Sequence, residues 1–292
     1  MSLDALINRL EPTAFEQFKA DPLRFLARRA YAFSTRWRRA HMPNSNTPVR
    51  VVCISDTHSH HQELPPLVDG DILIHAGDLT NSGTEQELYS ALQWLADQPH
   101  PHKIFIAGNH DKALIGTNPE RAAILSAFPS LTYLEESSLT LNVRGRTLVV
   151  YGSPLTPKHG SWPFQYPRSA PEQAHWSQIP LHTDILVTHG PPAHHCDLGS
   201  GCASLLAALW AVRPRLHVFG HIHAARGVEH LAWSSAQAAY ERLCAGRGRW
   251  WDLFVIILGI WRTALLSTTL VNAASLGGFK DEKRRPPIAV DI

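Results

Sequence analysis

The stretch LHVFGHIH, residues 216–223, has three histidines in eight positions of what otherwise looks like a buried strand. A lone histidine in such a strand is usually a core residue, because a neutral imidazole needs only one hydrogen bond there. Here one residue separates His221 from His223, and His221 directly follows Gly220. If the strand ends at the glycine, both imidazoles lie on the turn beyond it and can point at one place. A bound metal ion requires such convergence.

Five other short runs, rich in apolar and β-branched residues, have the length and composition of buried strands. They are residues 50–55, 71–76, 103–108, 147–152 and 184–189. Apolar residues at helical spacing, together with capping residues, predict helices over 84–98, from 118 onward and over 202–212. Strands that alternate with helices favour an α/β layered domain.

Length and composition narrow the class of protein. A chain of 292 residues can bury a substantial core, and a net charge of +2 does not mark a nucleic-acid-binding protein. The four cysteines form no Cys-x-x-Cys pair, and the first residues lack the apolar core of a secretory signal. These features predict a reduced protein in the cytoplasm.

Two segments lie outside the alternation of strands and helices. Residues 1–49 comprise a basic helical extension, with six arginines between 24 and 39, and a turn-rich linker. Residues 250–266 are the most apolar stretch, yet their uncharged core over 253–261 is shorter than the roughly 20 residues of a membrane span. The predicted organisation is the extension over 1–49, then one domain over 50–292 with an apolar helical insertion at about 235–266.

These two segments have two interpretations. The arginines of 24–39 and the apolar face of 250–266 match a peripheral contact with an anionic membrane, so that a cytoplasmic protein would be membrane-associated. Alternatively, the first segment is a solvated helix packed on the domain, and the second is a cap near the mouth of an active site.

Residues with metal-binding side chains follow five of the six predicted strands. They are Asp56 and His58, Asp78, the cluster Asn109, His110 and Asp111, then His189, and finally His221 and His223. An isolated aspartate after a strand is usually a turn residue, but open α/β sheets assemble their sites at the carboxyl ends of strands. Five such clusters, each beside a small residue, therefore predict one shared site.

The number of ligands indicates two metal ions. A single metal ion binds fewer than seven side chains. Two ions that share one carboxylate as a bridging ligand can bind all seven. Two-metal sites also suit in-line displacement at phosphorus. Nitrogen and oxygen ligands without a thiolate favour divalent transition metals, namely Mn²⁺, iron as Fe²⁺ or Fe³⁺, or Zn²⁺.

Read as D-x-H, G-D, G-N-H-D, H and G-H-x-H, these motifs resemble the calcineurin-like metallophosphoesterase superfamily. The segments DILIHAGDLT (71–80), VTHGPP (187–192) and LVNAAS (270–275) are similar to its metallophosphoesterase-domain-containing branch, which is related to class III cyclic-nucleotide phosphodiesterases. The resemblance implies a four-layer α-β-β-α sandwich, of mixed α/β class, with a dinuclear metal centre at the carboxyl edges of its strands.

The resemblance also implies a role for each residue of the motifs. One metal ion would be held by Asp56, His58, Asp78 and His223, and the other by Asp78, Asn109, His189 and His221. Asp78 is then the bridge, and a water or hydroxide shared by the metals is the nucleophile. His110 is expected to donate a proton or contact the phosphate, and Asp111 to orient His110.

The expected function is hydrolysis of a small phosphodiester, with a cyclic nucleotide as one candidate. The alternatives are a phosphomonoesterase or phosphoprotein phosphatase with the same metals, and a membrane-surface metal-binding scaffold with weak catalysis. Nucleic acid is disfavoured as a partner because basic residues cluster only in 24–39.

Three further residues are candidates for substrate contact. His194 and His195 follow His189 on the same predicted loop. Trp162 can stack on a base, with packing of its loop against the domain as the alternative.

Overall fold

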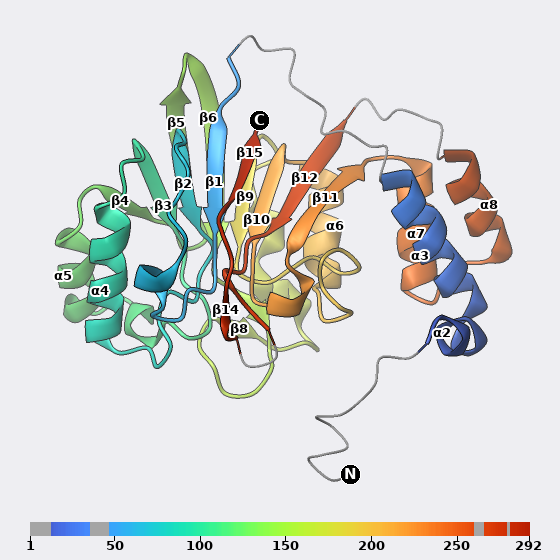
Figure 1. Cartoon of the computed structure of the whole chain (residues 1–292), viewed down its shortest axis with the longest axis horizontal. Coiled ribbons are helices and arrows are strands. Elements are labelled where there is room, and N and C mark those ends of the chain that lie inside the picture. The colour runs from blue at the N-terminus through green and yellow to red at the C-terminus, as the bar shows by residue number, and fades with distance from the viewer. Residues whose placement is uncertain (1–12, 36–46, 260–265, 279–280) are drawn as a thin grey trace. The chain divides into compact units, whose positions relative to one another are not determined.

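The six runs predicted as buried strands all form strands, and they are divided between two β-sheets (Figure 1). The structure is a computed structural model that describes residues 13–35, 47–259, 266–278 and 281–292. The chain divides into two compact units. The sandwich unit comprises residues 40–231 and 266–292, and the helical unit comprises residues 1–39 and 232–265.

The first sheet of the sandwich unit has five strands in the order β15-β1-β2-β3-β4. Strands β1 to β4 are parallel to their neighbours, and β15 pairs antiparallel with β1. The strands are β1 (Arg50–Ile54), β2 (Ile72–His75), β3 (His102–Phe105), β4 (Leu131–Tyr133) and β15 (Ile288–Asp291).

The second sheet has six strands in the order β11-β12-β10-β9-β6-β5. Strands β12, β10, β9 and β6 are parallel to one another, and β5 pairs antiparallel with β6. The strands are β5 (Ser137–Val143), β6 (Arg146–Ser153), β9 (Ile185–Thr188), β10 (Leu216–Phe219), β11 (Gly227–Ala232) and β12 (Ser267–Asn272). Two short pairs complete the set: β7 (Thr156–Pro157) with β8 (Gln165–Tyr166), and β13 (Leu276–Gly277) with β14 (Lys283–Arg284).

The apolar core lies between the two sheets. Alternate residues of β1 illustrate the arrangement: Val51 and Cys53 join a buried cluster with residues of the second sheet, such as Val150 and Val218. Val52 and Ile54 join a separate cluster with the helices on the outer face of the first sheet. A strand that is buried on both faces has apolar residues at successive positions, so these strands were recognisable in the sequence as continuous apolar runs.

The helices of the sandwich unit cover the outer faces of the sheets. They are α4 (Glu85–Ala96), α5 (Pro119–Ser126) and α6 (Ala203–Val212), and 3₁₀ turns lie at His61–Glu63, Lys112–Leu114, Pro171–Ala174, Trp176–Gln178 and His223–Ala225. Thr84 and Glu87 form the predicted capping box at the start of α4. Figure 1 shows α4 and α5 beside the first sheet and α6 beside the second. The predicted four-layer α-β-β-α sandwich is confirmed.

The carboxyl ends of the two sheets meet at one edge. A parallel bridge joins Ser55, just after β1, to Ala274, just after β12. The loops that follow the parallel strands of both sheets therefore gather around this bridge, where α/β proteins assemble their sites.

The helical unit joins two segments that the sequence analysis treats as separate. Its described helices are α2 (Ala14–Ala20), α3 (Pro22–Thr35), α7 (Ser235–Cys244) and α8 (Trp250–Gly259). The rings of Tyr31 and Tyr240 stack with centroids 3.8 Å apart, and the Tyr31 hydroxyl donates to Gln237 Oε1 at 2.9 Å. None of the described helices has the length and hydrophobicity needed to cross a membrane.

Candidate metal centre and active site

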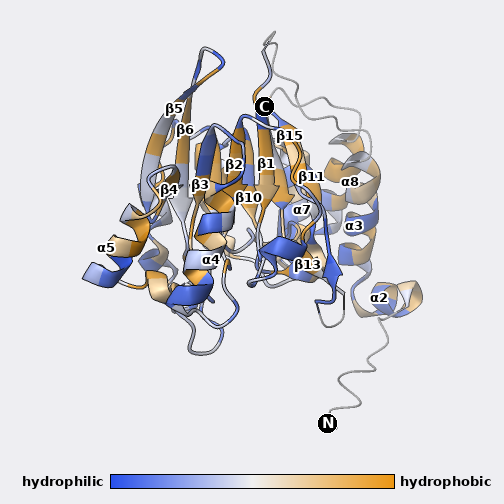
Figure 2. Cartoon of the chain, turned by 60° about the vertical axis from the view of Figure 1, so that its left-hand side comes forward, coloured by the Kyte–Doolittle hydropathy of each residue, from blue (hydrophilic) through white to orange (hydrophobic). Residues whose placement is uncertain are grey.

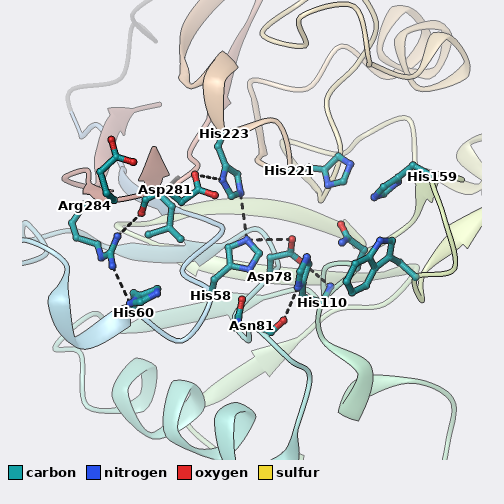
Figure 3. A pocket seen from close by; sticks show the side chains of 14 residues that line it. His58, His60, Asp78, Asn81, His110, His159, His221, His223, Asp281 and Arg284 are labelled. Carbon is teal, nitrogen blue, oxygen red and sulfur yellow. Dashed lines mark hydrogen bonds and ion pairs between the residues drawn. The ribbon is translucent and has the colours of Figure 1, made fainter. Parts of the chain in front are cut away.

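A pocket of about 660 Å³ opens at the edge where the sheets meet (Figure 3). Among the predicted site residues, those that line it are His58, Asp78, Asn109, His110, Trp162, His221 and His223. Asp56 and His189 are fully buried beside them. The structure thus brings together all seven predicted metal ligands from five loops that are distant in sequence.

The first group of ligands consists of Asp56, His58 and His223, whose donor atoms lie within 4.8 Å of one another. The Nε2 atoms of the two histidines are 3.3 Å apart, and His223 Nε2 is 3.3 Å from Asp56 Oδ1. Nitrogen and carboxylate oxygen atoms that converge in this way suit a transition-metal ion.

The second group consists of Asp78, His189 and His221, again within 4.8 Å of one another. His189 Nε2 is 3.2 Å from Asp78 Oδ2 and 3.1 Å from Asn109 Oδ1. Asp78 Oδ2 is also 3.7 Å from His58 Nε2 of the first group. Asp78 therefore lies between the two groups, as a bridging ligand must.

The orientation of two imidazoles provides a test of whether these residues suit a metal. His189 Nδ1 lies 2.9 Å from the carbonyl oxygen of Ala76, and His223 Nδ1 lies 2.8 Å from Asp281 Oδ1. Because a carbonyl only accepts hydrogen bonds, the Nδ1 of His189 carries a proton. Its Nε2, which faces Asp78 and Asn109, is therefore the nitrogen that would bind a metal once the imidazolium loses its second proton. Metal-binding histidines are typically fixed in this way by a carbonyl or carboxylate, so the residues fit a metal centre.

The backbone at the ligands is strained. Asp56, His58, Asp78 and His221 all have positive φ angles, between 41° and 67°, where residues other than glycine are uncommon. Such conformations cost on the order of 1–3 kcal/mol each and persist where the surroundings enforce them, most often at functional sites.

Glycine allows the loops to approach the carboxylates. A Cβ atom on Gly220 would lie 2.0 Å from Asp56 Oδ2, and one on Gly108 would lie 2.3 Å from Asp78 Oδ1. Only a residue without a side chain fits at either position. The small residues beside the clusters are therefore required by the close packing of the site.

The carboxylates and imidazoles shift one another's pKa. Burial raises the pKa of Asp56, but the hydrogen bond and charge of His223 outweigh it and lower the pKa to about 2. Burial lowers the pKa of His189 and His223, but the nearby carboxylates outweigh it and raise each pKa to about 9. Burial lowers the pKa of His221 to about 3. Without metal, the carboxylates thus hold two of the imidazoles in the protonated form.

His110 lies beside the ligands with its ring fixed on three sides. Its Nδ1 is 2.7 Å from the carbonyl oxygen of Asn81, to which it donates. The ring stacks on Trp162 with centroids 4.4 Å apart and meets His58 edge-on at 4.6 Å. Among the described residues, no protein group hydrogen-bonds with its Nε2. That nitrogen is therefore the one available for proton exchange with a substrate.

The implied role of Asp111 needs correction. Its carboxylate accepts hydrogen bonds from the backbone N–H groups of Gly108, Leu79 and Thr80, at 2.8–3.2 Å, and from the Thr80 hydroxyl at 2.7 Å. It forms no hydrogen bond with the imidazole of His110, whose Nδ1 donates to the carbonyl oxygen of Asn81 instead. Asp111 thus ties the loops after β2 and β3 together, and burial raises its pKa to about 6.

The three candidates for substrate contact differ in their placement. Trp162 lines the pocket with 39% of its surface exposed. His195 is fully buried, with Nδ1 2.7 Å from Glu229 Oε1, and neither it nor His194 lines the pocket. The structure therefore does not support a substrate contact by these two histidines.

Sequence reasoning missed several residues of the pocket wall. Figure 3 shows His159 next to His221 on one side, and Asp281, Arg284 and His60 on the other. The ring of His159 lies 4.7 Å from that of His221. His60, His159 and Asp281 lie on loops, and Arg284 lies on the short strand β14 within a charged run, DEKRR over 281–285, that resembles a solvated tail.

Comparison with known proteins identifies the family. The model of the calcineurin-like phosphoesterase family matches residues 49–225, which is more than half of the chain. The chain belongs to the calcineurin-like phosphoesterase family. The match ends two residues after His223, so it contains all seven candidate ligands.

Related proteins place this chain in the metallophosphoesterase-domain-containing branch of the family. Metallophosphoesterase domain-containing protein 1 of Homo sapiens is 37% identical over 61% of this chain and 62% of its own length. UPF0046 protein C25E10.12 of Caenorhabditis elegans is 37% identical over 64% of this chain and 73% of its own.

A third relative is much longer. The protein named "Probable rhamnogalacturonate lyase C" of Emericella nidulans is 47% identical over 99% of this chain, but this chain spans only 29% of its length. This chain thus corresponds to less than a third of the protein that carries the lyase name.

We predict that metal binding releases protons. In the metal-free protein the pKa values of His189 and His223 are each about 9, so both imidazoles are protonated at pH 7 and each must lose a proton to bind a metal. The apparent affinity for Mn²⁺ should therefore fall as the pH is lowered from 9 to 7, by about tenfold per unit for each proton displaced.

Calorimetric titration with Mn²⁺ in buffers of different ionisation enthalpy measures the protons released. Close to two protons should leave on full loading at pH 7. Asp281→Asn removes a charge that raises the pKa of His223 and should reduce that number. Binding without proton release, or with an affinity independent of pH, would contradict the assigned ligands.

Proposed function

We propose that this chain hydrolyses phosphodiesters at a centre of two divalent transition-metal ions, with small diesters such as cyclic nucleotides as candidate substrates. The observation that carries the proposal is the position of Asp78, whose carboxylate lies 3.2 Å from His189 and 3.7 Å from His58, one histidine from each group of ligands. When bound, two metal ions at such a site neutralise phosphate charge and lower the pKa of a water molecule.

The donors restrict which metals fit. Imidazole nitrogen, carboxylate oxygen and one amide oxygen suit Mn²⁺, iron or Zn²⁺. The four cysteines do not line the pocket, so no thiolate is available to select a softer ion. The buried carboxylates of Asp56 and Asp78 supply the negative charge that a pair of cations requires.

His110 is the candidate general acid. Because Nδ1 donates to the Asn81 carbonyl, a proton delivered to a leaving group must come from Nε2 of the imidazolium. Trp162 and His58 hold the plane of the ring, so this nitrogen keeps its direction without further support. An alkoxide leaving from a ribose needs such a proton, whereas p-nitrophenolate departs without one.

The charge of the pocket wall favours a diester over a monoester. Asp281 and Glu282 both line the pocket. Arg284 lies near them, but its guanidinium contacts Glu63 at 2.8 Å and donates to the carbonyl oxygen of Asp281 at 2.6 Å. A phosphomonoester carries about −1.5 to −2 charges at neutral pH and a diester only one, so the acidic wall repels the monoester more strongly.

The first prediction of this proposal concerns the leaving group. His110→Ala should slow hydrolysis of an unactivated nucleotide diester by about 10²–10⁴-fold, the usual contribution of a general acid, and should slow that of bis-p-nitrophenyl phosphate much less. The measurement is kcat on both substrates, with metal content determined for each variant. His60→Ala is the matched control, because His60 lines the same pocket and pairs with Glu63.

Equal losses on the two esters would show that His110 binds phosphate or supports the metals, and the acid role would be dropped. Complete inactivity of the metal-loaded wild-type chain on both diesters, and on p-nitrophenyl phosphate, would refute the enzymatic function itself.

The second prediction concerns the acidic wall. Glu282→Gln removes one negative charge and should raise kcat/KM for p-nitrophenyl phosphate relative to bis-p-nitrophenyl phosphate by about threefold, the effect of one charge at several Å in water. Glu172→Gln, an exposed glutamate outside the pocket, is the control and should leave the ratio unchanged. An unchanged ratio for Glu282→Gln would remove the electrostatic argument for diesters.

A further inference from the structure

Helix α8 of the helical unit presents a stripe of large apolar side chains to solvent. We call Trp250, Trp251, Phe254, Ile257 and Leu258 the α8 stripe; all five are exposed, and Trp251 reaches 70%. Their positions, i, i+1, i+4, i+7 and i+8, place them on one face of an α-helix. Figure 2 shows the apolar residues of α8 in orange.

The stripe is separate from the face that packs inside the unit. Ile256 is only 2% exposed and belongs to a buried cluster with Tyr31, Tyr240 and Leu243. Asp252 is also buried, where it pairs with Arg242 and caps its own helix through the N–H of Arg249. The core of the helical unit is therefore satisfied without the stripe, and contiguous exposed apolar surface of this kind marks an interaction site.

The charge around the stripe indicates the kind of partner. The described residues of the helical unit carry seven basic and four acidic side chains, a net charge of +3. Arg247 and Arg249 are exposed and immediately precede α8. Two of the acidic side chains are already neutralised, Asp21 by Arg24 and Asp252 by Arg242. An anionic surface complements this distribution.

We propose that the α8 stripe inserts into the interfacial region of an anionic phospholipid membrane, with Arg247 and Arg249 toward the lipid phosphates. The described helix has ten residues, half of what a span needs, so it would lie in the plane of the interface. Tryptophan is the side chain most favoured at that depth, because its ring is apolar and its N–H can reach water.

Two arginines of the N-terminal segment that were expected to meet anionic lipid already have partners within the helical unit. Arg24 is paired with Asp21, and the guanidinium of Arg29 lies over the Phe25 ring at 5.3 Å. Helix α3 packs through Ala27 and Tyr31 against α7 and α8, so its role is to support α8. Arg36, Arg38 and Arg39, and residues 260–265, lie outside the described residues.

The experiment is sedimentation of the full chain with vesicles of phosphatidylcholine alone or with about 30% phosphatidylserine, at low and physiological salt. The wild type should bind the anionic vesicles, with weaker binding at higher salt. Trp251→Ser with Phe254→Ser should lower the partition coefficient by tenfold or more, and Arg247→Glu should lower it several-fold.

The matched control is Leu181→Ser with Leu198→Ser, which should bind like the wild type. It removes two apolar side chains of the sandwich unit that are at least as exposed as those of the stripe variant, at 73% and 70%. Since all these side chains are exposed, each variant should keep the wild-type circular dichroism. Failure of the wild type to bind anionic vesicles, or equal binding by the stripe variant, would overturn the proposal. If the wild type instead self-associates and does not bind vesicles, and the stripe variant stays monomeric, the stripe contacts a second copy of the chain.

Discussion

The site depends on the meeting of two sheet edges at the backbone bridge between Ser55 and Ala274. Each sheet alone provides only part of the ligand set, because Asp56, Asp78 and Asn109 follow strands of the first sheet and His189 and His221 follow strands of the second. Only where the carboxyl ends of both sheets face each other can Asp78 Oδ2 lie 3.2 Å from His189 Nε2. The apolar core between the sheets therefore holds the metal ligands in place as well as stabilising the fold.

That core also sustains the strained backbone of the site. Four ligands, among them Asp56 and Asp78, adopt left-handed conformations that each cost on the order of 1–3 kcal/mol. Without metal, the site adds the cost of burying carboxylates close together, which protonated His189 and His223 offset in part. The neighbouring loops and their glycines therefore hold this arrangement. Preorganisation of this kind is what a metal centre needs for selective binding.

The predictability of each part follows from its local pattern. Strands such as β2 and β9 are buried on both faces and form continuous apolar runs, whereas the edge strands β5 and β15 mix polar and apolar residues and were not predicted. The metal ligands were predictable because each follows a recognisable strand. Asn81, His159 and Asp281 were not, because their roles come from loops brought together only by the tertiary fold. The same reason explains the helical unit: nothing local in α3 indicates that it packs against helices about 200 residues later.

The central claim is that one carboxylate, that of Asp78, joins two metal ions in a single centre. Anomalous diffraction from crystals of the Mn²⁺-loaded chain tests it most directly. The account predicts two peaks about 3.5–4 Å apart, both at bonding distance from the Asp78 carboxylate, and loss of both peaks in crystals of Asp78→Ala. A single peak, or a second peak that does not contact Asp78, would contradict it.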